Sequence, residues 1–181
     1  MTTVFLEPID ASPEACSGYG IVIQDKSVDR RIPIPFYDHV EEGQNLPFAY
    51  SGKATLRTAR IHPANREVFW LERHRKLTQL FLGVGGNEFI LVLGRPTESQ
   101  VPDLESIAAF RFAAGSGILI HQSVWHDFPM AVDKPVTVLT ANSEEIVLAL
   151  TQMEGPQEMD QNDVLKIDVK RRLGATVTVK I

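Results

Sequence analysis

The chain has 181 residues, with 44% hydrophobic and 23% charged residues and a formal net charge of −5. This average composition excludes a disordered, fibrous or disulfide-stapled protein, and the length allows roughly 70% of the unfolded surface to be buried. Scattered basic residues and an acidic balance speak against nucleic-acid binding, which needs clustered Lys and Arg.

The N-terminal residues do not resemble a signal peptide, and the apolar runs are too short for a membrane span. Glu7 and Asp10 lie where a signal peptide would have a basic and then an apolar region, and no 18 apolar residues run together. The single Cys16 cannot form an internal disulfide, which fits a reducing compartment. We therefore expect a cytoplasmic protein without a membrane span, with Cys16 in a structural role.

Short segments of alternating apolar and polar residues, rich in Val, Ile, Thr and Phe, predict β-strands along most of the chain. Gly, Pro, Asn and Asp separate them, and Gly85-Gly86 has the spacing of a hairpin turn. The expected strands are residues 20–24, 55–62, 68–74, 79–84, 88–93, 108–112, 117–121, 136–141, 146–151 and 176–181.

Helical signals are few. Ser12-Pro13 resembles an N-cap followed by the first residue of a short helix, and residues 103–107 allow one further turn. Residues 154–163 are polar and predict an exposed loop, and the basic run 170–172 is typical of a solvated turn or strand end. The pattern predicts one all-β domain over residues 1–181, an antiparallel barrel or sandwich of the jelly-roll type with short helical pieces.

The densest chemical signal is the segment from Ile120 to Asp127, which contains two of the five histidines. His121 ends an apolar strand, and His126 follows a short turn beside Trp125. Asp127 is a candidate to orient His126. Taken singly, a histidine at a strand end is more often a structural hydrogen-bond donor than a catalyst.

A second polar cluster lies at the end of the strand 68–74. Trp70, Glu72 and His74 share one side of an extended strand, and a turn through residues 75–78 returns Gln79 to that side. A charged hairpin that faces water would give the same pattern. The recurrence of such residues at a second strand end favours a site.

The two clusters resemble the two motifs of cupin barrels. Glu72, His74 and Gln79 stand at the spacing of the first motif, and Ser123-Val124-Trp125-His126 resembles the second. In that family two histidines and a glutamate of the first motif and one histidine of the second bind a divalent metal. This chain has Glu72 in place of the first histidine and Gln79 in place of the glutamate.

Within cupins, the chain is similar to the ureidoglycolate lyase family over roughly residues 15 to 132. The similarity rests on segments in both clusters and between them: Tyr19-Gly20, Glu72-Arg73-His74, Thr78-Gln79 with Phe81, Pro102-Asp103-Leu104, Ala109-Phe110, Gly117 with His121, and Val124-Trp125-His126. The chain departs from the family at Arg75 and Asp127. Residues 138–142 also lack the family's usual Asp-Arg pair.

The resemblance implies a carbon–nitrogen lyase that splits ureidoglycolate, a small carboxylate, into glyoxylate and urea. Histidines, which titrate near neutral pH, suit the two proton transfers of this reaction. The implied catalytic residues are His74, His126, Glu72 and His121, and the implied substrate-binding residues are Gln79, Trp125 and Arg73. A weakly bound nickel, manganese or zinc ion is expected at His74, His126, Glu72 and Gln79, because the neutral amide removes one ligand charge.

Two other functions and the oligomeric state stay open at this point. One alternative is a metal-dependent cupin of another type, an isomerase or dioxygenase that acts on a small carboxylic acid. The other is a non-catalytic cupin that binds a small ligand. A homodimer is expected, with the apolar segment 32–36 covering the edge of its partner.

Overall fold

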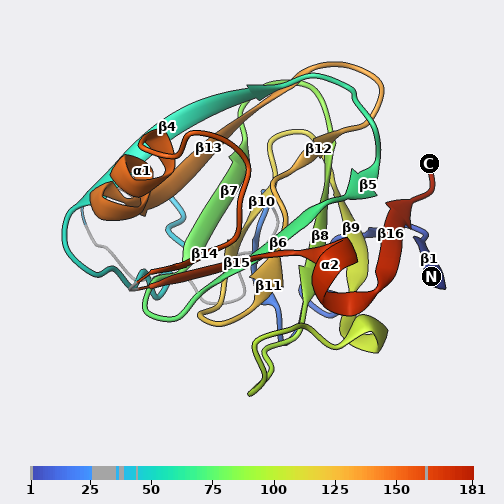
Figure 1. Cartoon of the computed structure of the whole chain (residues 1–181). Helices are drawn as coiled ribbons and strands as arrows, with labels where there is room; N and C mark the ends of the chain where they lie inside the picture. The colour runs from blue at the N-terminus through green and yellow to red at the C-terminus, as the bar shows by residue number, and fades with distance from the viewer. Residues whose placement is uncertain (1, 26–35, 37–38, 44, 162) are drawn as a thin grey trace.

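The computed structural model describes residues 2–25, 36, 39–43, 45–161 and 163–181. Two large β-sheets face each other, and a small third sheet lies against the outer side of one of them (Figure 1). Helix α1 (Glu144–Thr151) lies at one end of this arrangement, and both termini lie at the other.

The first large sheet is fully antiparallel and has the order β3-β10-β7-β13-β4. Its strands are β3 (Gly20–Ile23), β10 (Gly117–Ile120), β7 (Gln79–Gly83), β13 (Val136–Ser143) and β4 (Ala54–Ile61). Close packing against β7 requires Gly117, because a Cβ at this position would lie 2.2 Å from the carbonyl oxygen of Phe81. No larger residue fits there without moving a strand.

The second large sheet has the order β14-β15-β6-β11-β8-β9-β2, and β12 also pairs with β8. Its strands are β14 (Met159–Gln161), β15 (Val164–Asp168), β6 (Trp70–His74), β11 (Trp125–His126), β8 (Phe89–Gly94), β9 (Ala108–Phe112), β2 (Ile9–Asp10) and β12 (Met130–Ala131). All its pairs are antiparallel except β2 with β9.

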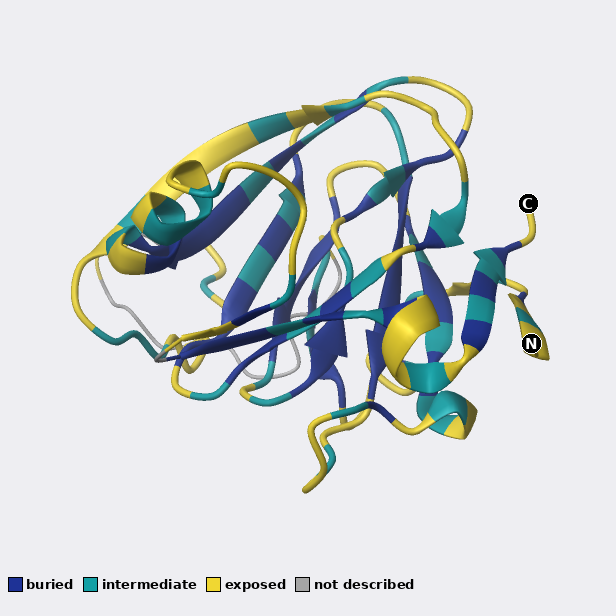
Figure 2. Cartoon of the chain, in the orientation of Figure 1, coloured by how far each residue is buried: buried dark blue, intermediate teal, exposed yellow. Residues whose placement is uncertain are grey.

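The third sheet consists of β1 (Thr2–Leu6), β16 (Ala175–Val179) and β5 (Glu67–Val68), with β1 and β16 parallel. One core fills the space between the two large sheets, and a second lies between the outer face of the second sheet and the small sheet. The buried segments accordingly form the inner strands of the arrangement in Figure 2. The predicted all-β fold is confirmed. The expected antiparallel barrel is not closed, because its strands divide into separate sheets, and two strand pairs are parallel.

One expected strand is a helix. Residues 146–151 lie in α1, where the hydroxyl oxygen of Ser143 accepts a hydrogen bond from the Ile146 N–H at 3.3 Å and caps the first turn. Glu144 and Glu145 lie in that first turn, where their negative charges interact favourably with the positive end of the helix dipole and stabilise the helix. The alternation suggested a strand, but the capping residue and the two acids determine the local structure.

The C-terminal quarter departs further from expectation. The expected loop 154–163 contains strand β14, and its last residue, Asp163, is buried. The basic run 170–172 belongs to helix α2 (Val169–Leu173), capped by Asp168 at its start and by Gly174, with a φ of 60°, at its end. The reason is again local, since an Asp cap and a left-handed Gly bracket the run.

The smaller expectations have mixed outcomes. The turn near residue 103 is present as the 3₁₀ segment η1 (Leu104–Ser106), whereas Ser12 starts hydrogen-bonded turns and not a helix. Cys16 is fully buried, and burial raises the pKa of its thiol to about 11, as a structural role requires. Residues 32–35 of the expected dimer segment lie outside the described residues. None of the described helices has the length and apolarity needed to cross a membrane.

Candidate functional site

A row of polar side chains crosses the second large sheet on the face that looks toward the first. In the strand register Lys166 of β15 lies opposite Glu72 of β6, and Glu72 lies opposite His126 of β11. Directly opposed side chains on one face of a sheet are in contact distance. Leu93 of β8 continues the row and belongs to the core between the sheets, so these side chains face that interior.

Three of the predicted site residues come together in this interior. Oε1 of Glu72 lies 3.9 Å from Nε2 of His74 and 3.9 Å from Nδ1 of His126. The two imidazole rings are stacked, with centroids 5.3 Å apart. The sequence prediction that the two distant segments meet at Glu72, His74 and His126 agrees with this geometry.

The ring atoms of this group are buried and lack partners among the described residues. Both nitrogens of His74 and Nε2 of His126 make no hydrogen bond there. An unsatisfied buried polar atom costs about 1–3 kcal/mol, so a fold does not keep several of them in one place without a use. The group is therefore the strongest candidate for a chemical site.

The electrostatics of the group favour an ionised carboxylate beside neutral imidazole. Burial alone would raise the pKa of Glu72, but the nearby Lys166, His126 and His74 outweigh burial and lower that pKa to about 2. Burial lowers the pKa of His126 to about 4, since the cost of desolvation exceeds the attraction of Glu72. At neutral pH His126 is therefore uncharged.

Two residues of the group were missed in the sequence. Nζ of Lys166 donates a hydrogen bond to Oε2 of Glu72 at 2.8 Å. Oδ2 of the buried Asp163 lies 3.4 Å from Nδ1 of His74, and Oδ1 accepts a hydrogen bond from the Lys76 N–H. A signal was present, because residues 164–169 alternate with period two as a strand does.

A strained turn connects the two site segments. The N–H of Ser123 donates to the carbonyl oxygen of His74 at 2.6 Å, and Ser123 has a φ of 65°, in the left-handed region that non-glycine residues rarely occupy. This turn leads directly into β11 and His126. The strained backbone of Ser123 costs free energy, and in return the turn fixes the position of His126 relative to His74.

Gln79 lies on the inner face of the opposite sheet. Its Nε2 donates to Oγ1 of Thr140 at 2.7 Å and to the carbonyl oxygen of Ala141 at 2.9 Å, while its Oε1 is buried without a partner. Phe81, two residues along the same face of β7, packs edge to face against His126. The free amide oxygen therefore borders the same interior as the histidines.

Arg73 and Trp125 point the other way. They alternate with Glu72, His74 and His126 along their strands, so their side chains lie on the outer face, where Trp125 belongs to the second core. The Arg73 guanidinium stacks 4.6 Å above the Trp125 ring and donates to the Thr97 carbonyl oxygen. The structure gives this pair a packing role and separates it from the candidate site.

His121 is also separated from the group. It directly follows β10, and its side chain continues the face of that strand that points away from the space between the sheets. It lines another pocket, together with residues such as Phe48, Thr78 and Gln122. Asp127 does not orient His126 through its carboxylate, which instead accepts the Phe128 N–H at 2.7 Å. Burial raises the pKa of Asp127 to about 7. The contact between Asp127 and His126 runs through the backbone carbonyl oxygen, 3.3 Å from Nδ1.

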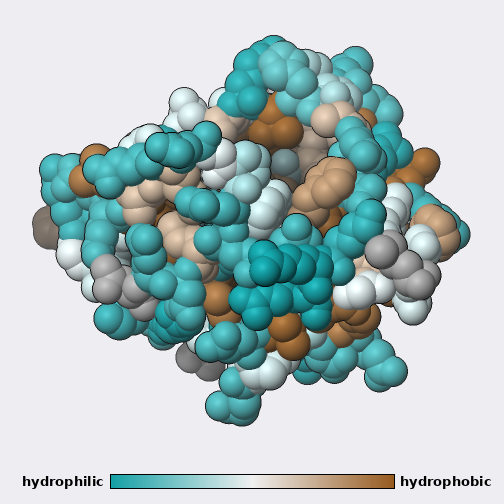
Figure 3. Space-filling view, in the orientation of Figure 1, coloured by the Kyte–Doolittle hydropathy of each residue, from teal (hydrophilic) through white to brown (hydrophobic). Residues whose placement is uncertain are grey.

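A cavity of about 260 Å³ adjoins the group on the side of Lys166. Trp70 and Lys166 of the second sheet form one wall, and Leu150, Met153 and the segment 155–157 form the other. The most hydrophilic side chains on the face shown in Figure 3 gather near β15 and α2. The cavity thus opens beside a polar surface.

Glu72, His74 and His126 also form a possible metal site, because one ligand atom from each lies within 4.8 Å of the others. Imidazole nitrogen and carboxylate oxygen suit nickel, manganese and zinc. The residues fit a divalent ion, although Lys166 already neutralises the Glu72 carboxylate.

Comparison with known proteins identifies the family. The family model described as ureidoglycolate lyase matches residues 1–159. The chain belongs to the ureidoglycolate lyase family. Ureidoglycolate lyases of Escherichia coli O139:H28 and of Shigella boydii serotype 18 are each 28% identical to it over 131 residues, which cover 67% of this chain and 76% of theirs.

Among solved structures, a dTDP sugar isomerase from Desulfovibrio desulfuricans G20 aligns with a TM-score of 0.41 and 21% identity, covering 67% of this chain and 75% of the other. The family match confirms the resemblance recognised in the two site segments, and with it the expected type of enzyme, a lyase that acts on ureidoglycolate. The two alternative functions have no better support.

Proposed function

We propose that this ureidoglycolate lyase family member cleaves ureidoglycolate to glyoxylate and urea at the group Glu72, His74 and His126. The observation that carries the assignment is the shared carboxylate oxygen, Oε1 of Glu72, at 3.9 Å from a ring nitrogen of each histidine. Two proton-transfer groups and a link between them are what this elimination needs.

In the proposed reaction neutral His126 accepts the hydroxyl proton of the substrate. The electron pair of the O–H bond forms the carbonyl of glyoxylate, the carbon–nitrogen bond breaks, and its electron pair stays on the urea nitrogen. His74, which must enter the reaction with both ring nitrogens protonated, donates one of these protons to that nitrogen and becomes neutral. The proton held by His126 then returns to His74 through Glu72, so that atoms, charge and the protonation state of the enzyme all balance.

The neighbouring residues position these groups. The Asp163 carboxylate beside Nδ1 of His74 holds that ring so that Nε2 faces Glu72. The amide oxygen of Gln79, free of partners, can accept a hydrogen bond from the urea nitrogen. Phe81 and Phe128, in edge-to-face contact, border His126 and help to exclude water.

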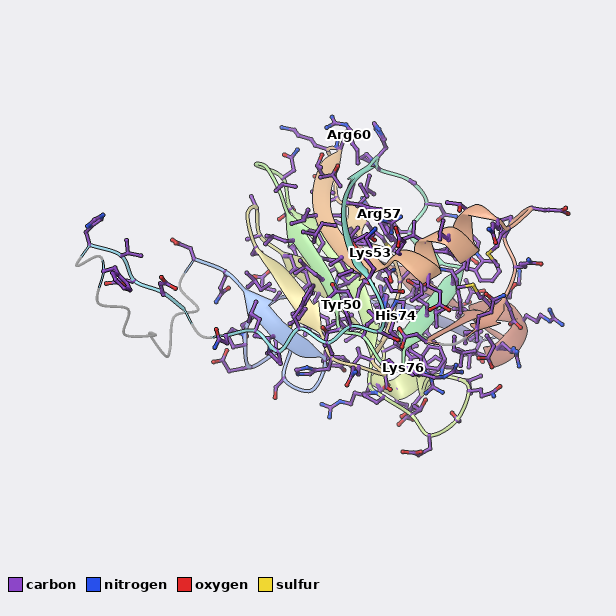
Figure 4. The ribbon with its side chains drawn as sticks, turned by 90° about the vertical axis from the view of Figure 1, so that its left-hand side faces the viewer. Tyr50, Lys53, Arg57, Arg60, His74 and Lys76 are labelled. Atoms are coloured by element: carbon purple, nitrogen blue, oxygen red, sulfur yellow. The ribbon has the colours of Figure 1, made fainter. Side chains whose placement is uncertain are left out.

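Basic side chains on the edge of the other sheet favour an anionic substrate. Arg57 and Arg60 are exposed along β4, and Figure 4 shows them in one view with His74. Lys53, just before β4, is paired with Glu144 at 3.0 Å. Arg57 shares its face of β4 with Ala59, which packs against the core between the sheets. The positive potential of such an edge attracts a small carboxylate.

Alternatively, a divalent ion would be held by Glu72, His74 and His126. It would then polarise the substrate oxygen as a Lewis acid and replace the proton transfer by the two rings, whose nitrogens it would occupy. Because Gln79 is neutral and Lys166 competes for Glu72, we propose weak, chelator-sensitive binding. A homodimer likewise stays a proposal.

The test is release of urea and glyoxylate from racemic ureidoglycolate, with and without chelator. We expect both products in equal amounts, and activity that rises when nickel or manganese is added. Wild-type protein that releases neither product under any of these conditions contradicts the proposed function. Activity indifferent to chelator, with less than about a tenth of an equivalent of bound metal, contradicts only the metal.

A further inference from the structure

Among the residues that the structure describes, Lys166 is the one cation that the register places in the site row. It lies beyond residues 1–159, which match the family. Its ammonium group holds Oε2 of Glu72 at 2.8 Å, on the side of that carboxylate away from the histidines. Its side chain is 25% exposed, whereas that of Glu72 is 12% exposed. Lys166 therefore stands between the buried group and the outside.

The ammonium group has hydrogen-bonding capacity left over. A lysine offers three N–H donors, and the bond to Glu72 uses one. The same side chain lines the cavity of about 260 Å³ with Trp70 and Met153. A cation fixed by one carboxylate and facing a small cavity is suited to bind a second carboxylate there.

We propose that Lys166 binds the carboxylate of the substrate and so orients ureidoglycolate between the cavity and the two histidines. This assignment rests on the proposed function for the identity of the substrate. The group that Lys166 would bind is the substrate carboxylate, which the product glyoxylate keeps and the product urea lacks, so glyoxylate can be used as a probe. Glu72 then has two roles, one oxygen positioning Lys166 and the other serving the histidines.

The ion pair with Glu72 does not by itself explain why a lysine occupies position 166. A partly buried Lys–Glu pair loses hydration on both charges, and its net contribution to stability is often near zero. The chain also contains an exposed pair of the same type, Lys180 with Glu7 at 3.8 Å, directly after strands β16 and β1 and not among the residues that line the cavity. That pair provides a matched control for removal of a lysine charge.

The experiment measures glyoxylate binding by isothermal titration calorimetry, which does not depend on turnover. We expect Lys166→Met to weaken glyoxylate binding by about 10- to 100-fold, the loss of one charged hydrogen bond. Lys166→Arg should restore binding to within about threefold, and Lys180→Met should leave it unchanged. In kinetics, inhibition by glyoxylate should weaken in Lys166→Met, while inhibition by urea should not change.

Removal of Lys166 leaves the Glu72 charge without its partner, so the variant can lose stability. If Lys166→Met does not fold, the double variant Glu72→Gln/Lys166→Met, compared with Glu72→Gln alone, isolates the lysine. Equal glyoxylate binding with and without Lys166 overturns the proposal, and so does a wild-type protein that does not bind glyoxylate at millimolar concentration. Lys166-dependent binding without any lyase activity would support this inference while contradicting the proposed function.

Discussion

The space between the two large sheets has two ends of opposite character. At one end Phe89 and Phe112 stack with ring centroids 4.9 Å apart and leave no exposed surface. At the other end His74, His126 and Gln79 are equally buried and keep polar atoms without partners. Strands β8 and β9 of the second sheet supply the apolar end, and β6 and β11 of the same sheet, with β7 of the first, supply the polar end. The fold tolerates unsatisfied polar atoms at one end because the apolar end stabilises the sheets.

The largest expected effect lies at the polar end. His126→Ala should lower lyase turnover by about 10²- to 10⁴-fold, the usual contribution of one proton-transfer group. Its effect on unfolding should be small by comparison, since a ring with an unpartnered nitrogen is removed. Product release and urea denaturation, measured on one preparation, test both. Full activity in both His126→Ala and His74→Ala would refute the site.

The reverse pattern is expected at the apolar end. Phe112→Ala should lower the free energy of unfolding by about 3–5 kcal/mol, because it leaves a cavity in a fully packed core. The KM of the fraction that stays folded should not change. A larger effect on KM than on stability would show that the two ends are not independent.

The pH dependence of stability should also differ between the ends. The folded pKa of His126, about 4, lies below the value near 6.5 expected in the unfolded chain. The unfolded state therefore binds more protons, and the contribution of neutral His126 is present above pH 6.5 and lost as the pH falls toward 4. The difference in unfolding free energy between wild type and His126→Gln, measured over this range, should show that loss. A pH-independent difference would contradict a buried neutral ring.

A smaller effect is expected from a substitution that adds a charged metal ligand at the polar end. Gln79→Glu supplies the carboxylate that cupin motifs have at this position and should raise affinity for nickel or manganese by about tenfold, since it adds a charged ligand. Titration calorimetry with each ion measures it, and Gln79→Ala serves as the control without a ligand oxygen. If Glu and Ala variants bind metal alike, position 79 does not face the metal group.

The sequence contained the parts of the site that lie within local motifs. Glu72 and His74 alternate on one strand and His126 follows a recognisable turn, so their types and spacing were sufficient to select them as candidates. Asp163 and Lys166 were missed because only the pairing of β15 with β6, 94 residues apart for Lys166 and Glu72, brings them to the site. The alternation of residues 164–169 indicates a strand, but it does not show which strand is its neighbour.

Alternation also has two sides, and the sequence does not say which side is inward. His121 was expected in the cavity, yet it continues the outward face of β10, while Ile118 and Ile120 face the core. Residues 146–151 show a related limit, since a short apolar run suits a strand or a helix and the Ser143 cap decides. The overall β architecture was easier to predict because many separate segments each show the alternation of a strand and are bounded by turn residues.

Strand β15 carries Lys166, and Asp163 directly precedes it. Among the described residues, the other side of β15 pairs only with the short strand β14. Edge segments with few neighbours open locally at lower free energy than the strands at the centre of a sheet. Detachment of this edge would remove the support of His74 and the partner of Glu72 in a single event. On warming, the enzyme should therefore lose activity before its core melts, and the amides of residues 164–168 should exchange with solvent earlier than those of β8.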